Sequence, residues 1–356
     1  MEDVLQKLNL KDTAIVRDVE FGNKIVIVDG QPGCGKTMLS PIVAALERVE
    51  LLTFAYEVEM VCALQFLQKI DQDTAQTLIK LFTDLRIYNL MMSRETNFRL
   101  TDSSSVFRDA KPFRYLKRLF QAGDEAITER IKRDKPILHL TTHDLLGRAG
   151  SVFSALGKKL VFIEVVRHPL YMLKQEVLNM ESLFLSDPRH FEVYFTYKNK
   201  AFPYFVRGWE DLYLKSNLVE KAIYLIESMT KRTKAFKAKL KERQTAAKLI
   251  TVPFECFVID PESYMEKIVD SLETKISSVT RRMMRKQNVP RKMYAEGVGL
   301  KIYKRCGWEP PVSADENYEL QLRRQFAENK ASKEAMQVLD RISAEYEEEY
   351  LGGRKK

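Results

Sequence analysis

The sequence has few cysteines, and no two of them lie close together. The four are isolated at Cys34, Cys62, Cys256 and Cys306. Because none forms a Cys-x-x-Cys pair, the pattern excludes the usual spacing of a zinc site and of a disulfide framework. We therefore expect a protein of the reducing cytoplasm.

Long apolar runs are also missing. No stretch approaches the roughly 20 residues needed to cross a bilayer, and the amino-terminal segment lacks the basic start and apolar core of a signal peptide. Internal repeats and low-complexity segments are absent as well. The chain of 356 residues is 45% hydrophobic and 30% charged, which is typical of a globular protein.

The charge balance is basic, with a net charge of +9. Such a surface attracts anions, among them nucleotides, nucleic acids and acidic glycans. The most basic stretch, over 231–248, lacks the repeated aromatic interleaving of single-strand binders. Nucleic acid is therefore not the expected partner, and this stretch is typical of the solvent face of a long helix.

Short apolar segments alternate with helical patterns along the chain. The segments that predict strands are 24–29, 50–55, 136–141, 160–166 and 249–253. Strands that alternate with helices indicate an α/β fold with a doubly wound parallel sheet of about five strands. We expect one domain over 1–356, with large helical insertions at about 57–133 and 180–245 and a helical carboxy-terminal tail at about 311–356.

Residues 30–37, with the sequence GQPGCGKT, match the full Walker A pattern between a predicted strand and a predicted helix. Glycines let backbone N–H groups curl around phosphate oxygens at a helix N-terminus. The residues expected to bind phosphates are Gly30, Gly33, Cys34, Gly35, Lys36 and Thr37. Cys34 is either a small residue that fits the loop or a thiol activated by the helix. The Thr37 hydroxyl would hold Mg²⁺ if the nucleotide is ATP.

Polar residues at the ends of two predicted strands are further candidates. His143 follows the strand 136–141, where it could deprotonate a hydroxyl, with Asp144 as its orienter or as a metal partner. Alternatively, these residues cap the next helix. Glu164 lies within an apolar strand, where a carboxylate needs a partner, either a cation or Mg²⁺.

Four dispersed segments resemble the sulfotransferase-like branch of P-loop proteins, and they occur in the family's order. They are GQPGCGKTMLS (30–40), KPILHLTTHDLL (135–146), LVFIEVVRHPLYML (160–173), and PFECFVIDPESYMEKIVDSL (253–272) together with YEEEYL (346–351). The resemblance implies that the loop grips the 5′-phosphosulfate of phosphoadenosine phosphosulfate. Family loops usually carry Ser-Gly-Thr where this chain has Cys34-Gly35-Lys36.

The resemblance also implies roles for residues outside the loop. Arg167 would bind the 3′-phosphate of the donor, with Gln175 at the position of a family serine. Arg285 and Lys286, in the basic cluster 281–286, would supply a late contact to the same phosphate. Glu57, followed by Glu59, stands where some bacterial members have a catalytic base, although the first turn of a helix also favours acids.

Three functions remain compatible with the sequence. In the first, phosphoadenosine phosphosulfate donates a sulfuryl group to a hydroxyl acceptor such as a sugar or glycan, with Lys36 and His143 stabilising the transferring group. In the second, ATP with Mg²⁺ is the donor of a kinase, because the intact Walker lysine and threonine suit ATP. In the third, the chain is a nucleotide-dependent switch or binding protein. Arginines in the polar loop 93–111 would suit an anionic acceptor.

Overall fold

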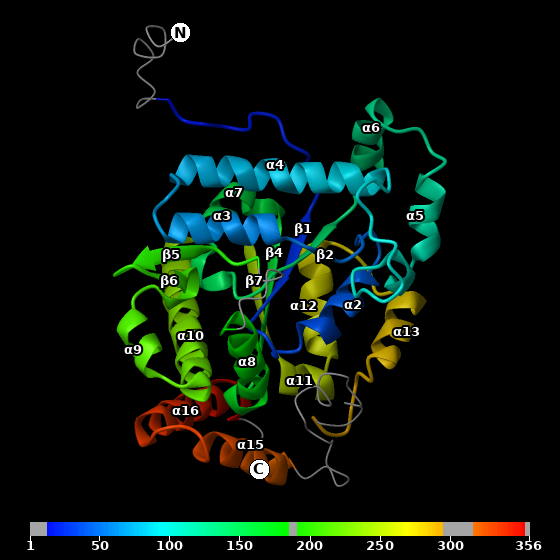
Figure 1. The fold of residues 1–356 in the computed structure, drawn as a ribbon. Helices are drawn as coiled ribbons and strands as arrows, with labels where there is room; N and C mark the ends of the chain where they lie inside the picture. Colours follow the sequence, from blue (N-terminus) through cyan, green and yellow to red (C-terminus); the bar gives the residue numbers. More distant parts are fainter. Residues whose placement is uncertain (1–12, 185–190, 295–315, 353–356) are drawn as a thin grey trace, which may run out of the picture.

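The computed structural model describes residues 13–184, 191–294 and 316–352, and a parallel β-sheet forms its centre (Figure 1). The strands occur in the order β2 (Thr53–Phe54), β3 (Leu138–Thr141), β1 (Ile25–Asp29), β4 (Leu160–Val166) and β7 (Lys248–Pro253). Every neighbouring pair is parallel. The predicted α/β class and five-stranded parallel sheet are confirmed.

The central strand β1 is buried on both faces, because alternate residues of a strand point to opposite sides of a sheet. Val26 and Val28 belong to one hydrophobic core, and Ile25 and Ile27 belong to the other. A strand covered on both faces has the continuous apolar sequence that parallel sheets require. The run of β-branched residues in β1 is thus explained by its central position.

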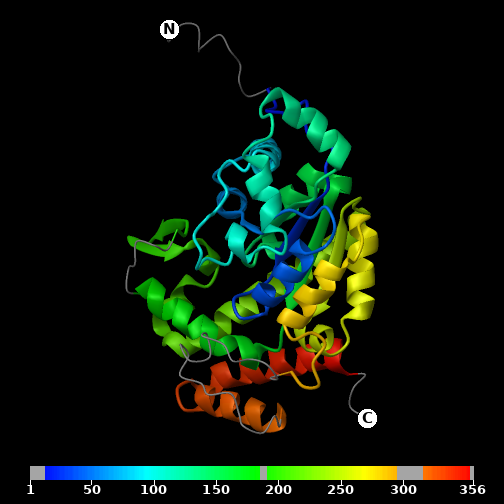
Figure 2. The same cartoon turned by 90° about the vertical axis from the view of Figure 1, so that its right-hand side faces the viewer.

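Helices cover both faces of the sheet, as Figures 1 and 2 show. The elements up to residue 184 are α2 (Lys36–Ala44), α3 (Tyr56–Phe66), α4 (Gln72–Met91), α5 (Pro112–Arg118), α6 (Glu125–Asp134), α7 (Gly150–Leu156) and α8 (Pro169–Phe184). Those that follow are α9 (Glu210–Lys215), α10 (Leu218–Arg243), α11 (Phe254–Ile259), α12 (Glu262–Leu272), α13 (Ser278–Lys286), α15 (Glu316–Glu328) and α16 (Lys333–Tyr346). Helices α3, α4 and α7 pack on the face of Ile25, and α2, α8 and α12 on that of Val26.

The stretch 180–245 is not helical throughout, in contrast to the prediction. It contains an antiparallel hairpin of β5 (Tyr194–Tyr197) and β6 (Lys200–Pro203). Lys198 and Asn199 both have positive φ, at 49° and 59°, as the tight turn of a two-residue hairpin demands. The Asn at the turn and the aromatic residues of β5 were the signals that the sequence offered.

Helices α15 and α16 lie against α8 and α10, at the lower end of the molecule in Figure 1. Among the residues that the structure describes, no helix is long and apolar enough to cross a membrane.

Strand order determines where a ligand can bind. The chain runs from β1 to the edge strand β2, returns to β3 beside β1, and then crosses to β4 on the other side of β1. In open α/β sheets, ligands bind at the carboxyl ends of the strands where the order reverses in this way. Residues 30–37 follow β1 at that point.

Candidate functional site

The loop 30–37 has a positive-φ backbone, which favours glycine, at three of its positions. Gly30, Gly33 and Gly35 have φ of 151°, 82° and 103°. A Cβ at Gly30 would lie 2.3 Å from the carbonyl oxygen of Val165, and one at Gly35 would lie 2.3 Å from the ring of Phe254. The loop therefore lies directly against β4 and α11, and side chains at these positions would displace it.

Lys36 begins α2 and folds back over the loop. Its side chain is buried, and its ammonium group donates a hydrogen bond to the carbonyl of Gly30. Thr37, the next residue, is exposed in the first turn of α2. The ammonium group and the amino end of the helix together give this loop a positive potential that favours phosphate.

Cys34 is buried in the loop. Burial raises the pKa of its thiol to about 11, although Lys36 and Arg167 oppose that rise. A thiol with so high a pKa is almost entirely protonated near neutral pH and is a poor nucleophile. Of the two interpretations of Cys34, the structure favours the small residue that fits the loop.

Asp29 ties the turn after β3 to the phosphate loop, a role that the sequence did not reveal. Its carboxylate accepts hydrogen bonds from the backbone N–H groups of Leu145 and Leu146, both at 2.9 Å, and from the Thr142 hydroxyl at 2.8 Å. The carbonyl of Gly30 also accepts a hydrogen bond from the N–H of Asp144 at 3.1 Å. These bonds hold residues 142–146 beside the loop, and with them His143.

His143 is paired with Glu59 of α3. A carboxylate oxygen of Glu59 lies 3.1 Å from Nδ1 of His143 and accepts the backbone N–H of the same residue at 2.7 Å. The imidazole also stacks on the rings of Phe54 and Tyr56 and remains 39% exposed. Glu57, the acid expected to act as a base, instead binds Arg86 at 2.5 Å, because it lies on another side of α3.

A cavity of about 340 Å³ opens beside His143. Its described lining residues come from the loop, α3, the turn after β3, α8, the hairpin region and α10: Pro32, Tyr56, Glu59, Met60, Ala63, His143, Asp144, Glu176, Asn179, Met180, Leu183, Phe191, Glu192, Val193, Tyr204, Phe205, Leu225 and Met229. Its volume is sufficient for a small organic molecule. The cavity thus joins the phosphate loop to the paired imidazole.

Asp144 does not act as the orienter of His143. It forms an ion pair with Arg148 at 3.3 Å, and both side chains are buried. Burial raises the pKa of Asp144 to about 7, an effect that Arg148 opposes. No cluster of three or more metal-ligating side chains occurs in the described part of the chain.

Arg167 and Gln175 both lie against the loop. Arg167 donates a hydrogen bond to the carbonyl of Gly33 at 3.0 Å and lies 4.2 Å from the ring centroid of Phe254. A Cβ at Gly33 would lie 3.2 Å from Cβ of Gln175. Arg291 approaches the same Phe254 ring, at 5.6 Å. Phe254 therefore has arginines from two distant segments around it, and the sequence did not single out Arg291.

The other predicted basic groups lie outside the described wall of the His143 cavity. Arg285 and Lys286 are exposed on α13, which packs on α2 through a hydrogen bond from Thr280 to the carbonyl of Ala45. Just after the polar loop 93–111, the half-buried Arg114 pairs with the buried carboxylate of Glu50 at 3.3 Å, ahead of the amino end of β2. None of these residues lines the cavity of His143 among its described walls.

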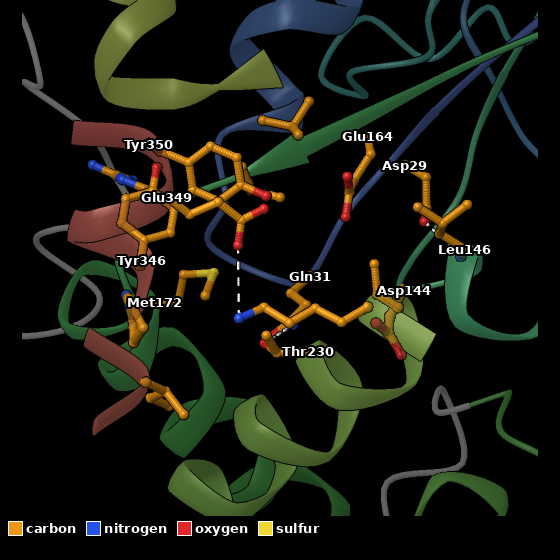
Figure 3. A pocket seen from close by; sticks show the side chains of 18 of the residues that line it. Asp29, Gln31, Asp144, Leu146, Glu164, Met172, Thr230, Tyr346, Glu349 and Tyr350 are labelled. Atoms are coloured by element: carbon orange, nitrogen blue, oxygen red, sulfur yellow. Dashed lines mark hydrogen bonds and ion pairs between the residues drawn. The ribbon is translucent and has the colours of Figure 1, made fainter. Parts of the chain in front are cut away.

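A second, smaller cavity of about 70 Å³ also adjoins the loop, at Gly30 and Gln31 (Figure 3). Figure 3 shows Tyr346, Glu349 and Tyr350 at the carboxyl end of the chain facing α10 across it. In its wall, Glu164 is paired with Lys237, so the cationic partner expected for this acid is present. The cavity is too small for a nucleotide and suits a few water molecules.

The sheet, its strand order and the loop define a P-loop α/β fold. The solved structures that resemble the chain include the sulfotransferase domain of the Synechococcus PCC 7002 olefin synthase, at 13% identity and a TM-score of 0.40, with 89% of this chain and 98% of that chain covered. Sulfotransferase STF9 from Mycobacterium avium has 12% identity and a TM-score of 0.40, with 98% and 80% covered. Mouse sulfotransferase SULT7A1 complexed with PAP has 12% identity and a TM-score of 0.35, with 98% and 91% covered.

The sequence matches no protein-family model and no curated protein. The function is therefore inferred from the residues of this chain.

Proposed function

We propose that this protein transfers a sulfuryl group from phosphoadenosine phosphosulfate to a hydroxyl acceptor. One observation carries the proposal: Pro32 of the phosphate loop and the His143–Glu59 pair line the same cavity. A donor phosphosulfate on the loop would therefore meet an acceptor hydroxyl beside an imidazole. The sequence segments that resemble sulfotransferases include both the loop and His143.

The roles follow from the positions of the groups. The acceptor oxygen forms a bond to sulfur while the bond from sulfur to the 5′-phosphate oxygen breaks, and the acceptor proton passes to His143. In this proposal the ammonium group of Lys36 leaves the Gly30 carbonyl when the donor binds. It then binds the bridging oxygen between sulfur and phosphate, where negative charge develops. Glu59 orients the imidazole through its contact with Nδ1.

Two features favour the sulfuryl donor over ATP. Arg167 is fixed beside the loop by the Gly33 carbonyl and the Phe254 ring, where it would bind the 3′-phosphate. The carboxylates next to the loop already have partners within the protein: Asp29 binds backbone amides, and Asp144 binds Arg148. Sulfuryl transfer, unlike phosphoryl transfer from ATP with Mg²⁺, does not require these carboxylates to bind a metal ion.

A kinase that uses ATP and Mg²⁺ is the second candidate. Its supporting observation is the exposed residue Thr37 directly after Lys36, because a hydroxyl at this position holds Mg²⁺ in Walker A proteins.

The acceptor side draws on both proposed insertions. Glu59, Met60 and Ala63 belong to 57–133, whereas Tyr204 and Phe205 belong to 180–245. In this proposal the whole chain acts as one catalytic domain in the cytoplasm.

Thermal unfolding in the presence of nucleotides tests the donor. Adenosine 3′,5′-bisphosphate without Mg²⁺ is expected to stabilise the protein, by about 2.7 kcal/mol when its concentration is a hundred times its Kd. ATP with Mg²⁺ is expected to have a much smaller effect. If ATP with Mg²⁺ raises Tm and adenosine 3′,5′-bisphosphate does not, the kinase is supported instead. If neither nucleotide raises Tm, both proposed donors are excluded.

A further inference from the structure

The cavity beside His143 is acidic. Four carboxyl groups line it, on Glu59, Asp144, Glu176 and Glu192, and none of its described lining residues is Lys or Arg. The charge of Asp144 is compensated by Arg148 behind the wall. Carboxyl groups thus outnumber cationic side chains in the described wall, which disfavours an anionic ligand and favours a cationic one.

Much of the rest of the wall is apolar, although Tyr56, Asn179 and Tyr204 also line it. Three methionines, Met60, Met180 and Met229, line it together with Phe191 and Phe205. Thioether and aromatic side chains bind apolar frames of varied shape, and they offer few partners to the hydroxyl groups of a sugar. An acceptor that fills this cavity therefore needs an apolar body.

Glu176, on α8, has the most informative environment of the four acids. Its side chain is only 1% exposed, and its Oε1 has no hydrogen-bond partner in the described structure. The other oxygen accepts one long hydrogen bond, at 3.5 Å, from the Asn179 amide. A buried carboxyl oxygen without a partner is costly. A ligand that donates hydrogen bonds at this position would remove that cost.

Burial also raises the pKa of Glu176 to about 8. The charged groups that act on it are Asp144, which raises the pKa further, and Lys36, which lowers it. Glu176 is consequently protonated near neutral pH when the cavity is empty. A cation bound beside it would stabilise the carboxylate and release the proton.

We propose that the acceptor is a hydroxyl compound with an ammonium group on an apolar frame, and that Glu176 binds this ammonium group. The proposal rests on the sulfuryl transfer proposed above and defines its acceptor class. It replaces the anionic or glycan acceptor expected from the sequence. The hydroxyl group faces His143, and the frame packs against the methionine and aromatic side chains of the wall.

Titration calorimetry on the full chain, saturated with adenosine 3′,5′-bisphosphate, tests this assignment. The probes are 4-hydroxyphenylalkylamines of increasing chain length, each compared with the neutral alkylphenol and the terminal carboxylate of the same length. We expect the best amine to bind at least about tenfold more tightly than its neutral partner, and the carboxylate to bind most weakly. Equal binding of the three, or no binding by any amine, would overturn the assignment.

Two variants test whether the preference for the amine depends on Glu176. Glu176→Gln is expected to abolish the preference for the amine while it leaves the binding of the neutral phenol and of the nucleotide unchanged. Glu181→Gln, an exposed position on the same helix, is the matched control and should keep the preference. If Glu176→Gln binds the amine as tightly as the parent protein does, Glu176 is not its partner. The ranking of probes on the parent protein remains decisive even if that variant does not fold.

Saturation with adenosine 3′,5′-bisphosphate before the titration separates the proposed donor from the proposed acceptor. A protein that fails to bind adenosine 3′,5′-bisphosphate contradicts the sulfuryl donor itself. A protein that binds the nucleotide but shows no preference for amines contradicts only the acceptor class.

Discussion

The phosphate loop and the acceptor cavity are built in different ways. The loop is one continuous segment, 30–37, and its shape is a property of the backbone at its glycines. The cavity is assembled from side chains that lie far apart in the sequence, such as Glu59, His143 and Glu176. A local pattern can specify the first, whereas only the folded chain brings the second together. The predictions below test whether the two regions also have separate roles.

The largest effect is expected at His143. His143→Ala should lower kcat for sulfuryl transfer to an alkylphenol by at least about 100-fold, because the proton of the acceptor loses its base. An activated phenol that ionises near neutral pH needs little help, so its turnover should fall far less. Affinity for adenosine 3′,5′-bisphosphate, measured by calorimetry, should stay unchanged. A similar loss of kcat with both phenols would assign His143 a structural role.

Glu59 and Glu57 form a matched pair within the same experiment. Glu59→Gln should lower kcat with the alkylphenol by about tenfold, because the Glu59 carboxylate holds the imidazole of His143 in its orientation. Glu57→Gln should leave kcat near that of the parent protein, since Glu57 binds Arg86. If Glu57→Gln lowered kcat more than Glu59→Gln did, Glu57 would be the base, as the sequence predicted.

An effect weaker than that of His143→Ala, and confined to the loop side, is expected for Gly35→Ala. The added Cβ would meet the Phe254 ring at 2.3 Å in a backbone with positive φ. We expect nucleotide binding to weaken by about 2 kcal/mol, or roughly thirtyfold. Gly157→Ala also has positive φ but no atom within 4 Å, and it should leave binding unchanged. Equal nucleotide affinities of the two variants would show that the loop tolerates displacement.

A smaller loss is expected for Arg167. Arg167→Met keeps part of the packing on Phe254 but loses the charge, so adenosine 3′,5′-bisphosphate should bind about tenfold more weakly. The matched variant Arg285→Met, on the exposed side of α13, should bind within about twofold of the parent protein. Adenosine 5′-phosphate, which lacks the 3′-phosphate, should not distinguish the Arg167 variant from the parent. If it does, Arg167 does not recognise that phosphate.

The smallest effect is expected at Cys34. Cys34→Ala should change nucleotide affinity by less than about threefold, because the residue contributes only its size. The raised pKa keeps the thiol protonated, so iodoacetamide at about pH 8 should modify Cys34 far more slowly than a free thiol. Rapid modification of Cys34 in the folded protein, detected by mass spectrometry, would contradict this environment.

The sequence predicted the fold well where periodicity is strong. The strand over 160–166 has the predicted bounds, because its apolar run is continuous and ends before Arg167. The strand over 50–55 was predicted too long, since only Thr53–Phe54 pairs with β3 and Glu50 turns into a buried cluster with Arg114 and Arg118. The hairpin of β5 and β6 was missed, because its strands are short and lie in a region read as helical.

The site was predictable only in part, because a sequence pattern reports local structure and not which distant side chains the fold brings together. Residues 30–37 and His143 stand next to strand ends, which meet at one edge of any parallel sheet. Asp29 looked like the last residue of a strand, although its carboxylate organises the turn of His143. Glu176 lies on α8 next to Gln175, a predicted site residue, but no motif in the sequence marks Glu176 itself. Its importance follows from burial and from an oxygen without a partner, and neither property is visible before folding.

The most direct measurement is a calorimetric titration of adenosine 3′,5′-bisphosphate into the parent protein and into Lys36→Met, without Mg²⁺. The parent should bind one nucleotide per chain, and the variant should bind it at least about tenfold more weakly, because a charge-assisted contact to phosphate is lost. Lys158→Met, at an exposed lysine, should behave like the parent protein. Equal affinities of the parent and the Lys36 variant would contradict the claim that the loop 30–37 binds the nucleotide.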